Sequence, residues 1–129
     1  MLTLAQPPAA IVAKVILVED DPALRSALVF AFSFDGFEVE AFDSAEALLA
    51  AGVTDADCLV IDYRLPGLDG FHLIEQLRQR GLNTPAVLIT TQPKPATKAR
   101  AVLLGVALIE KPLLTDELVE TIRGLVGRA

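Results

Sequence analysis

Short apolar runs that end in a carboxylate or a hydroxyl recur along the chain and predict buried strands. Residues 15–18 (VILV) are followed by three acids, residues 58–61 (CLVI) by Asp62, and residues 86–89 (AVLI) by Thr90. Four apolar residues in a row between turn signals are typical of strands that are covered on both faces, as in a parallel sheet.

Two further segments complete the strand pattern. Residues 37–42 alternate apolar and acidic side chains, which predicts a half-exposed strand at the edge of the sheet. Residues 106–110 predict a last strand that leads into Lys111 and a proline.

Capping signals predict a helix after each strand. The first helix is expected from about residue 22 to 34, with Asp21 as its N-cap and a proline in its first turn. The other helices are expected over residues 45–51, 70–80 and 96–104 and from residue 115 onward. On the first helix, helical spacing assigns the side that covers the sheet to Leu24, Ala27, Leu28 and Ala31.

The alternation of five strands with five helices predicts an α/β fold whose parallel strands are joined by right-handed crossovers. The chain has 129 residues, enough for one domain with a single core. We expect that domain over residues 14–129. Residues 1–13 contain two adjacent prolines and are expected to form a loose N-terminal tail.

Composition and charge remove several classes of function. The net charge of −6 argues against direct contact with nucleic acid. The longest apolar run, residues 101–109, is far too short to cross a membrane. The single cysteine, Cys58, excludes an internal disulfide and fits a cytoplasmic protein. There is no paired Cys/His spacing for zinc.

In such a sheet the carboxyl ends of the central strands open onto one crevice, where ligands bind. The side chains brought there are expected to be Glu19, Asp20, Asp21, Asp62, Thr90 and Lys111. Crowded carboxylates repel one another unless a cation lies among them, and hard oxygen ligands suit Mg²⁺. This inventory indicates phosphoryl transfer with a carboxylate as nucleophile. The alternative is that unrelated strands simply end in solvated acids that also begin helices.

Four short motifs, each at a predicted strand end, identify a family resemblance. They are residues 18–22 (VEDDP), 61–70 (IDYRLPGLDG), 89–90 (IT) and 109–112 (IEKP). With these motifs in this order, the chain resembles the receiver domain of two-component response regulators, such as the chemotaxis and nitrogen-fixation regulators. The resemblance covers about residue 14 to the C-terminus. It implies a flavodoxin-like, three-layer (βα)5 fold with strand order 2-1-3-4-5.

The resemblance also implies what the protein does. Asp62 would accept a phosphoryl group from a histidine kinase or a histidine phosphotransfer protein, with Mg²⁺ as cofactor. The metal ligands would be Glu19, Asp20, Asp62 and the backbone carbonyl of Arg64, with Asp20 the more direct ligand of the acidic pair. The protein would not be an enzyme beyond its self-catalysed phosphorylation and dephosphorylation, and it would signal through protein contacts.

Two other family positions are matched at the later strand ends. Thr90 would be the switch hydroxyl and Lys111 the phosphate-binding lysine, with a cis peptide before Pro112. Asp21 falls one place past the acidic pair, where capping of the first helix is the expected role.

The chain departs from the family pattern at Leu108, where receivers usually carry Tyr or Phe three residues before the lysine. A ring that swings inward on activation is therefore absent. The segment from Gly105 to Lys111 is also about one residue shorter than usual. These departures favour an alternative, a pseudo-receiver that binds a partner without being phosphorylated. A third reading, a phosphohydrolase of the haloacid-dehalogenase type, is disfavoured because Arg64 stands where such enzymes need a second Asp.

Two apolar surfaces are expected to contact partners. Phe30 and Phe34, with Val29 beside them, lie away from the core side of the first helix, where family kinases dock. Residues 102–104 are three consecutive apolar residues that cannot all face one core. With Leu108, they predict a surface on the fourth helix and fifth strand for a homodimer or an effector protein. No contact with a membrane is expected.

Overall fold

A computed structural model describes residues 12–53 and 55–127. Within them, five parallel strands form one sheet in the order β2-β1-β3-β4-β5, which is the predicted flavodoxin-like topology. The strands are β1 (Lys14–Val18), β2 (Glu38–Phe42), β3 (Cys58–Asp62), β4 (Ala86–Thr90) and β5 (Ala107–Glu110). The helices are α1 (Pro22–Phe34), α2 (Ala45–Ala51), α3 (Gly70–Gln79), α4 (Pro95–Leu104) and α5 (Thr115–Val126). Most of the predicted N-terminal tail, residues 1–11, lies outside the described residues.

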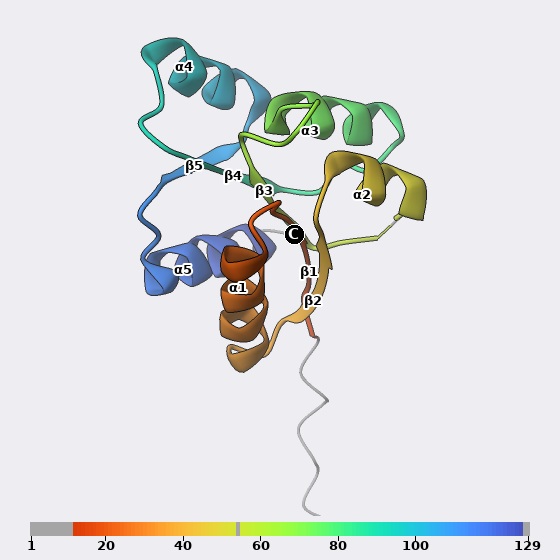
Figure 1. Cartoon of the computed structure of the whole chain (residues 1–129), viewed down its shortest axis with the longest axis vertical. Coiled ribbons are helices and arrows are strands. Elements are labelled where there is room, and N and C mark those ends of the chain that lie inside the picture. The colour runs from red at the N-terminus through yellow and green to blue at the C-terminus, as the bar shows by residue number, and fades with distance from the viewer. Residues whose placement is uncertain (1–11, 54, 128–129) are drawn as a thin grey trace, which may run out of the picture.

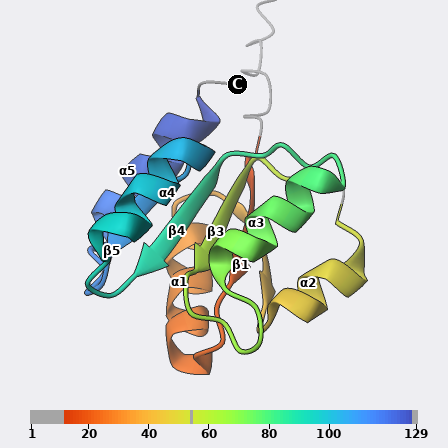
Figure 2. The same cartoon turned by 90° about the horizontal axis from the view of Figure 1, so that it is seen from above.

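The sheet is the middle of three layers. α1 and α5 cover one face, and α2, α3 and α4 cover the other (Figure 1). Figure 2 shows the central strands running side by side between these helices. Alternate residues of β1 and β3 enter opposite cores: Ile16 and Ile61 pack against α2 and α3, whereas Leu17 and Val60 pack against α1 and α5. The apolar runs of the sequence therefore reflect strands with no polar face.

The side of α1 that packs on the sheet agrees with the predicted one at Leu24, Leu28 and the half-buried Ala31, and differs at two positions. Leu28 and Phe32 are its buried residues and Leu24 is half-buried, which makes a stripe at spacing i, i+4. Ala27 was assigned to this side but is exposed, because it lies about 100° around the helix from Leu28. Phe32 was missed, although its ring is fully buried.

Strand and helix ends agree with the prediction to within one or two residues. The Asp21 carboxylate caps α1 by accepting hydrogen bonds from the N–H groups of Ala23 and Leu24. Ser44 caps α2, and Gly52 ends that helix in the left-handed region with φ of 65°. In the described part of the chain, no helix is both long and apolar enough to cross a membrane.

Gly70, at the start of α3, is fixed by a close approach to β3. Its N–H donates to the carbonyl of Tyr63 at 2.8 Å. A Cβ at this position would overlap Cδ1 of Leu88 and lie 2.9 Å from the backbone oxygen of Asp62. Only a residue without a side chain lets α3 begin this close to the end of the strand that carries Asp62.

Candidate functional site

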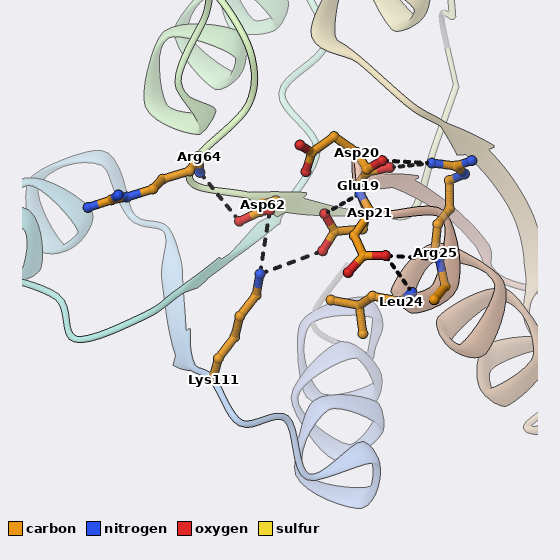
Figure 3. Close-up of polar contacts among 9 residues, drawn as sticks. Glu19, Asp20, Asp21, Leu24, Arg25, Asp62, Arg64 and Lys111 are labelled. Atoms are coloured by element: carbon orange, nitrogen blue, oxygen red, sulfur yellow. Dashed lines mark hydrogen bonds and ion pairs between the residues drawn. The ribbon is translucent and has the colours of Figure 1, made fainter.

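The carboxyl ends of β1 and β3 bring three carboxylates together, as the sequence predicted. One oxygen from each of Glu19, Asp20 and Asp62 lies within 4.8 Å of the others. Lys111 extends toward them from the end of β5 (Figure 3). Its Nζ lies 3.5 Å from Oδ2 of Asp62 and 3.7 Å from Oε1 of Glu19.

Glu19 is the most enclosed of these groups. The residue is 1% exposed, and its Oε1 atom has no hydrogen-bond partner among the described residues. Burial, followed by the neighbouring Asp62 carboxylate, raises the pKa of Glu19 to about 7. A buried acceptor without a donor, next to a second carboxylate, is a position that a cation would satisfy.

The backbone around the cluster is held by hydrogen bonds. The N–H of Glu19 donates to the carbonyl of Phe42 at 3.1 Å, which ties the end of β1 to β2. The N–H of Asp21 donates to Oε2 of Glu19 at 3.3 Å. On the opposite side, the N–H of Arg64 donates to Oδ1 of Asp62 at 3.3 Å. The Arg64 side chain points away from the acids in Figure 3.

Thr90 is buried at the end of β4, beside Asp62 on the neighbouring strand. Its carbonyl accepts a hydrogen bond of 2.7 Å from the N–H of Lys111, which joins the ends of β4 and β5. A small cleft begins there and is lined by Tyr63, Arg64, Thr90, Thr91, Gln92, Pro93, Lys94 and Thr97. The peptide bond between Lys111 and Pro112 is cis, as the resemblance implied.

Asp21 does not join the cluster of Glu19, Asp20 and Asp62. Its carboxylate is used in capping α1, which confirms the capping role expected for it. The structure thus separates the three consecutive acids after β1 into two that belong to the cluster and one that starts a helix.

Sequence reasoning missed Arg25 at this site. Its Nη1 donates to the carbonyl of Glu19 at 2.9 Å and to that of Asp20 at 3.4 Å. A signal was present: Arg25 lies in the first turn of a helix, where a cation opposes the helix dipole. A cation at such a position is expected to be stabilised by a nearby hydrogen-bond acceptor.

The donor set fits a hard divalent cation. All three side chains offer carboxylate oxygens, which Mg²⁺ prefers, and the exposed Asp20 leaves one side of the cluster open to solvent. Without a cation, the two buried carboxylates are balanced by Lys111 alone among the ion pairs of the described residues.

Comparison with known proteins gives one consistent result. The family model for the response regulator receiver domain matches residues 15–123. The transcriptional regulatory protein FixJ of Azorhizobium caulinodans is 33% identical over 115 residues, which cover 88% of this chain and 54% of that protein. The chain spans about half the length of the curated relatives it matches.

Solved structures agree with the sequence relatives. The receiver domain of the Francisella response regulator 1452 has a TM-score of 0.82 at 26% identity, covering 90% of this chain and 98% of that one. Full-length FixJ from B. japonicum has a TM-score of 0.81 at 31% identity, covering 90% of this chain and 58% of that one.

Proposed function

The chain belongs to the family of response regulator receiver domains of two-component systems, and we propose that it accepts a phosphoryl group on Asp62. The donor is a histidine kinase or a histidine phosphotransfer protein. One observation carries this proposal: the Asp62 carboxylate is buried at the end of β3, with the Lys111 ammonium 3.5 Å away and two further acids beside it.

In the proposed reaction, a carboxylate oxygen of Asp62 attacks the phosphorus of the donor phosphohistidine. The new P–O bond forms as the P–N bond breaks, and the bonding electrons stay on the donor imidazole. Lys111 then pairs with a phosphoryl oxygen instead of the Asp62 carboxylate, and the Thr90 hydroxyl donates a hydrogen bond to another phosphoryl oxygen. Most of the rate acceleration in phosphoryl transfer comes from positioning of the reacting groups and neutralisation of charge.

We propose Glu19, Asp20 and Asp62 as the side chains that hold Mg²⁺, with the backbone carbonyl of Arg64 as a further ligand. The unpartnered Oε1 of Glu19 and the raised pKa of that residue support this assignment. The ion supplies positive charge that offsets the repulsion between the carboxylates and the incoming phosphoryl group. The domain performs only its own phosphorylation and dephosphorylation and does not turn over a separate substrate.

The proposed docking surface for the phosphodonor is the outer side of α1. Phe30 and Phe34 are 74% and 84% exposed there, which supports the prediction that they do not serve the core. Val29 is half-buried and packs partly against the core, so it contributes less than expected. Because such a donor draws its phosphoryl group from ATP, we propose a cytoplasmic location.

A second proposed contact surface lies on α4 and β5. Val102 and Leu103 are 80% and 86% exposed, whereas Leu104 and Leu108 are half-buried against the core on that side. We propose that this surface binds a second copy of the domain or an effector protein, and that signalling proceeds through such protein contacts and not through direct contact with nucleic acid.

The pseudo-receiver is the second candidate function, and Leu108 favours it because no aromatic ring is available there for switching. Intact mass after incubation with acetyl phosphate and Mg²⁺ separates the two. A phospho-receiver gains the mass of one phosphoryl group, and a pseudo-receiver gains nothing. Asp62→Asn is the matched control, since it is nearly isosteric but lacks the nucleophilic carboxylate. Uptake at the wild-type rate by this variant would show that the acceptor is another residue.

A further inference from the structure

Arg25 makes an unusual pair of contacts behind the acidic cluster. A single nitrogen, Nη1, donates to the backbone carbonyls of two consecutive residues, Glu19 at 2.9 Å and Asp20 at 3.4 Å. Figure 3 shows the guanidinium beside Asp20, with its contacts to this loop drawn as dashed lines. In the described part of the chain, no carboxylate lies within ion-pair distance of Arg25. Its role is therefore geometric and not simple charge pairing.

The geometry of these contacts matters because peptide units are planar. The carbonyl of Glu19 belongs to the peptide plane before Cα of Asp20, and the carbonyl of Asp20 belongs to the plane after it. Holding both carbonyls on one nitrogen fixes the two planes relative to each other. It thereby fixes φ and ψ of Asp20 and the direction in which its Cα–Cβ bond leaves the backbone.

The rest of the loop is anchored on either side of Asp20. Before it, the Glu19 N–H is bound to the Phe42 carbonyl. After it, the Asp21 carboxylate is bound to the first N–H groups of α1. Asp20 itself is exposed and lacks packing that would orient it. Arg25 supplies the missing constraint at the residue between the two anchors.

We propose that Arg25 is a positioning residue for the cation site and sets the orientation of Asp20 toward Glu19 and Asp62. This inference rests on the proposed function, because it takes the acidic cluster to be a Mg²⁺ site. It also predicts that removing Arg25 changes Mg²⁺ affinity in the direction opposite to that expected from charge alone. Removing a nearby positive charge should tighten cation binding by Coulomb's law, whereas losing the constraint on Asp20 should weaken it.

The test is Mg²⁺ titration of the metal-free protein by calorimetry. We expect Arg25→Gln to weaken Mg²⁺ affinity by about tenfold, because substitution of residues that orient metal ligands commonly has an effect of this size. We expect Arg25→Lys to weaken it nearly as much. An ammonium keeps the charge, but its N–H groups rotate freely, whereas the N–H groups on Nη1 are fixed in the guanidinium plane. Arg78→Gln is the matched control: Arg78 also donates through Nη1 to a backbone carbonyl, that of Leu104 at the end of α4, remote from the acids.

Circular dichroism and urea unfolding of each variant separate folding from positioning. A purely structural Arg25 would lower stability and leave Mg²⁺ affinity at the wild-type value, and this result would overturn the inference. Tighter binding by Arg25→Gln, or wild-type affinity in Arg25→Lys, would overturn it as well. A wild-type protein that binds no Mg²⁺ would remove the proposed metal site and this inference together. If the wild type binds Mg²⁺ and the Arg25 variants bind it with the same affinity, the inference about Arg25 is wrong but the proposed metal site stands.

Discussion

The Lys111 ammonium lies 3.5 Å from Oδ2 of Asp62, so the proposed phosphoacceptor is already paired with a cation from another strand. The same ammonium lies 3.7 Å from Oε1 of Glu19. Lys111 therefore contacts two of the carboxylates that are proposed to hold Mg²⁺. We expect the lysine to neutralise these carboxylates in the metal-free protein and to compete with Mg²⁺ for them.

We therefore predict that Lys111→Gln tightens Mg²⁺ binding while slowing phosphate uptake from acetyl phosphate. Partly exposed ion pairs are worth up to about 1 kcal/mol, which corresponds to up to about fivefold in affinity. Calorimetry measures the first effect and intact mass over time the second. Lys111 and Arg25 are then two cations with opposite effects on one metal site. Weaker Mg²⁺ binding in Lys111→Gln would contradict the competition.

Glu19 gives the metal-free protein a pH dependence of stability. Its pKa rises from 4.5 in the unfolded chain to about 7 in the folded one, chiefly through burial. Between these values the folded state binds more protons than the unfolded state, so the free energy of unfolding falls as pH rises. We predict a loss on the order of 3 kcal/mol from about pH 4.5 to pH 7, with little further change from this group above that range.

Urea unfolding in EDTA across this pH range measures the effect. Glu19→Gln should flatten the profile and exceed the wild type in stability near pH 8. Glu120→Gln, a change of the same type at an exposed position on α5, should leave the slope as it is. An unchanged slope in Glu19→Gln would show that another group titrates.

The sequence predicted the fold and the members of the acidic cluster because both follow from the positions of strand ends. An apolar run that ends in Asp62 or Thr90 fixes which edge of a parallel sheet carries that side chain. Arg25 was missed because its place in the first turn of α1 indicates only that it needs an acceptor. The acceptors themselves are backbone carbonyls, which the sequence does not identify. The burial of Phe32 was not predicted, because choosing between overlapping apolar stripes on α1 needs the exact angle at which the helix packs on the sheet.

Because Gly70 lies against the end of β3, we predict that this position does not tolerate a side chain, which the sequence alone does not reveal. Gly70→Ala should lower the free energy of unfolding by about 1–3 kcal/mol, since the added methyl overlaps Leu88 and the backbone of Asp62. Gly124→Ala is the matched control, because nothing lies within 4 Å of a Cβ there and alanine favours the helix. Urea unfolding of both variants tests the prediction. Equal stability of the two variants would show that α3 can shift away from β3.

The exposed aromatic residues of α1 are predicted to affect the rate of phosphotransfer from a protein donor but not from a small-molecule donor. Phe30→Ala should slow phosphotransfer from the cognate kinase by about fivefold or more, which corresponds to an interface contribution of at least about 1 kcal/mol, and spare acetyl phosphate. Leu103→Ala removes a comparably exposed apolar side chain from α4 and serves as the control. Rates with both donors are compared by intact mass. Equal slowing with kinase and acetyl phosphate would assign Phe30 to folding of the site.

The α4–β5 surface predicts self-association that depends only weakly on phosphate. Phosphorylation adds about −1.5 to −2 charge at the strand ends, and Thr90 can shift toward it. No aromatic ring at position 108 can then transmit that shift to Val102 and Leu103, which are already 80% and 86% exposed. We expect sedimentation to show similar dimer fractions with and without beryllofluoride, and Leu103→Glu to remove the dimer in both conditions. A strict monomer that converts fully to dimer on adding beryllofluoride would show strong coupling by another route. Candidates for such a route lie at the α3–α4 contact, where Arg100 stacks 4.6 Å from the Phe71 ring centroid.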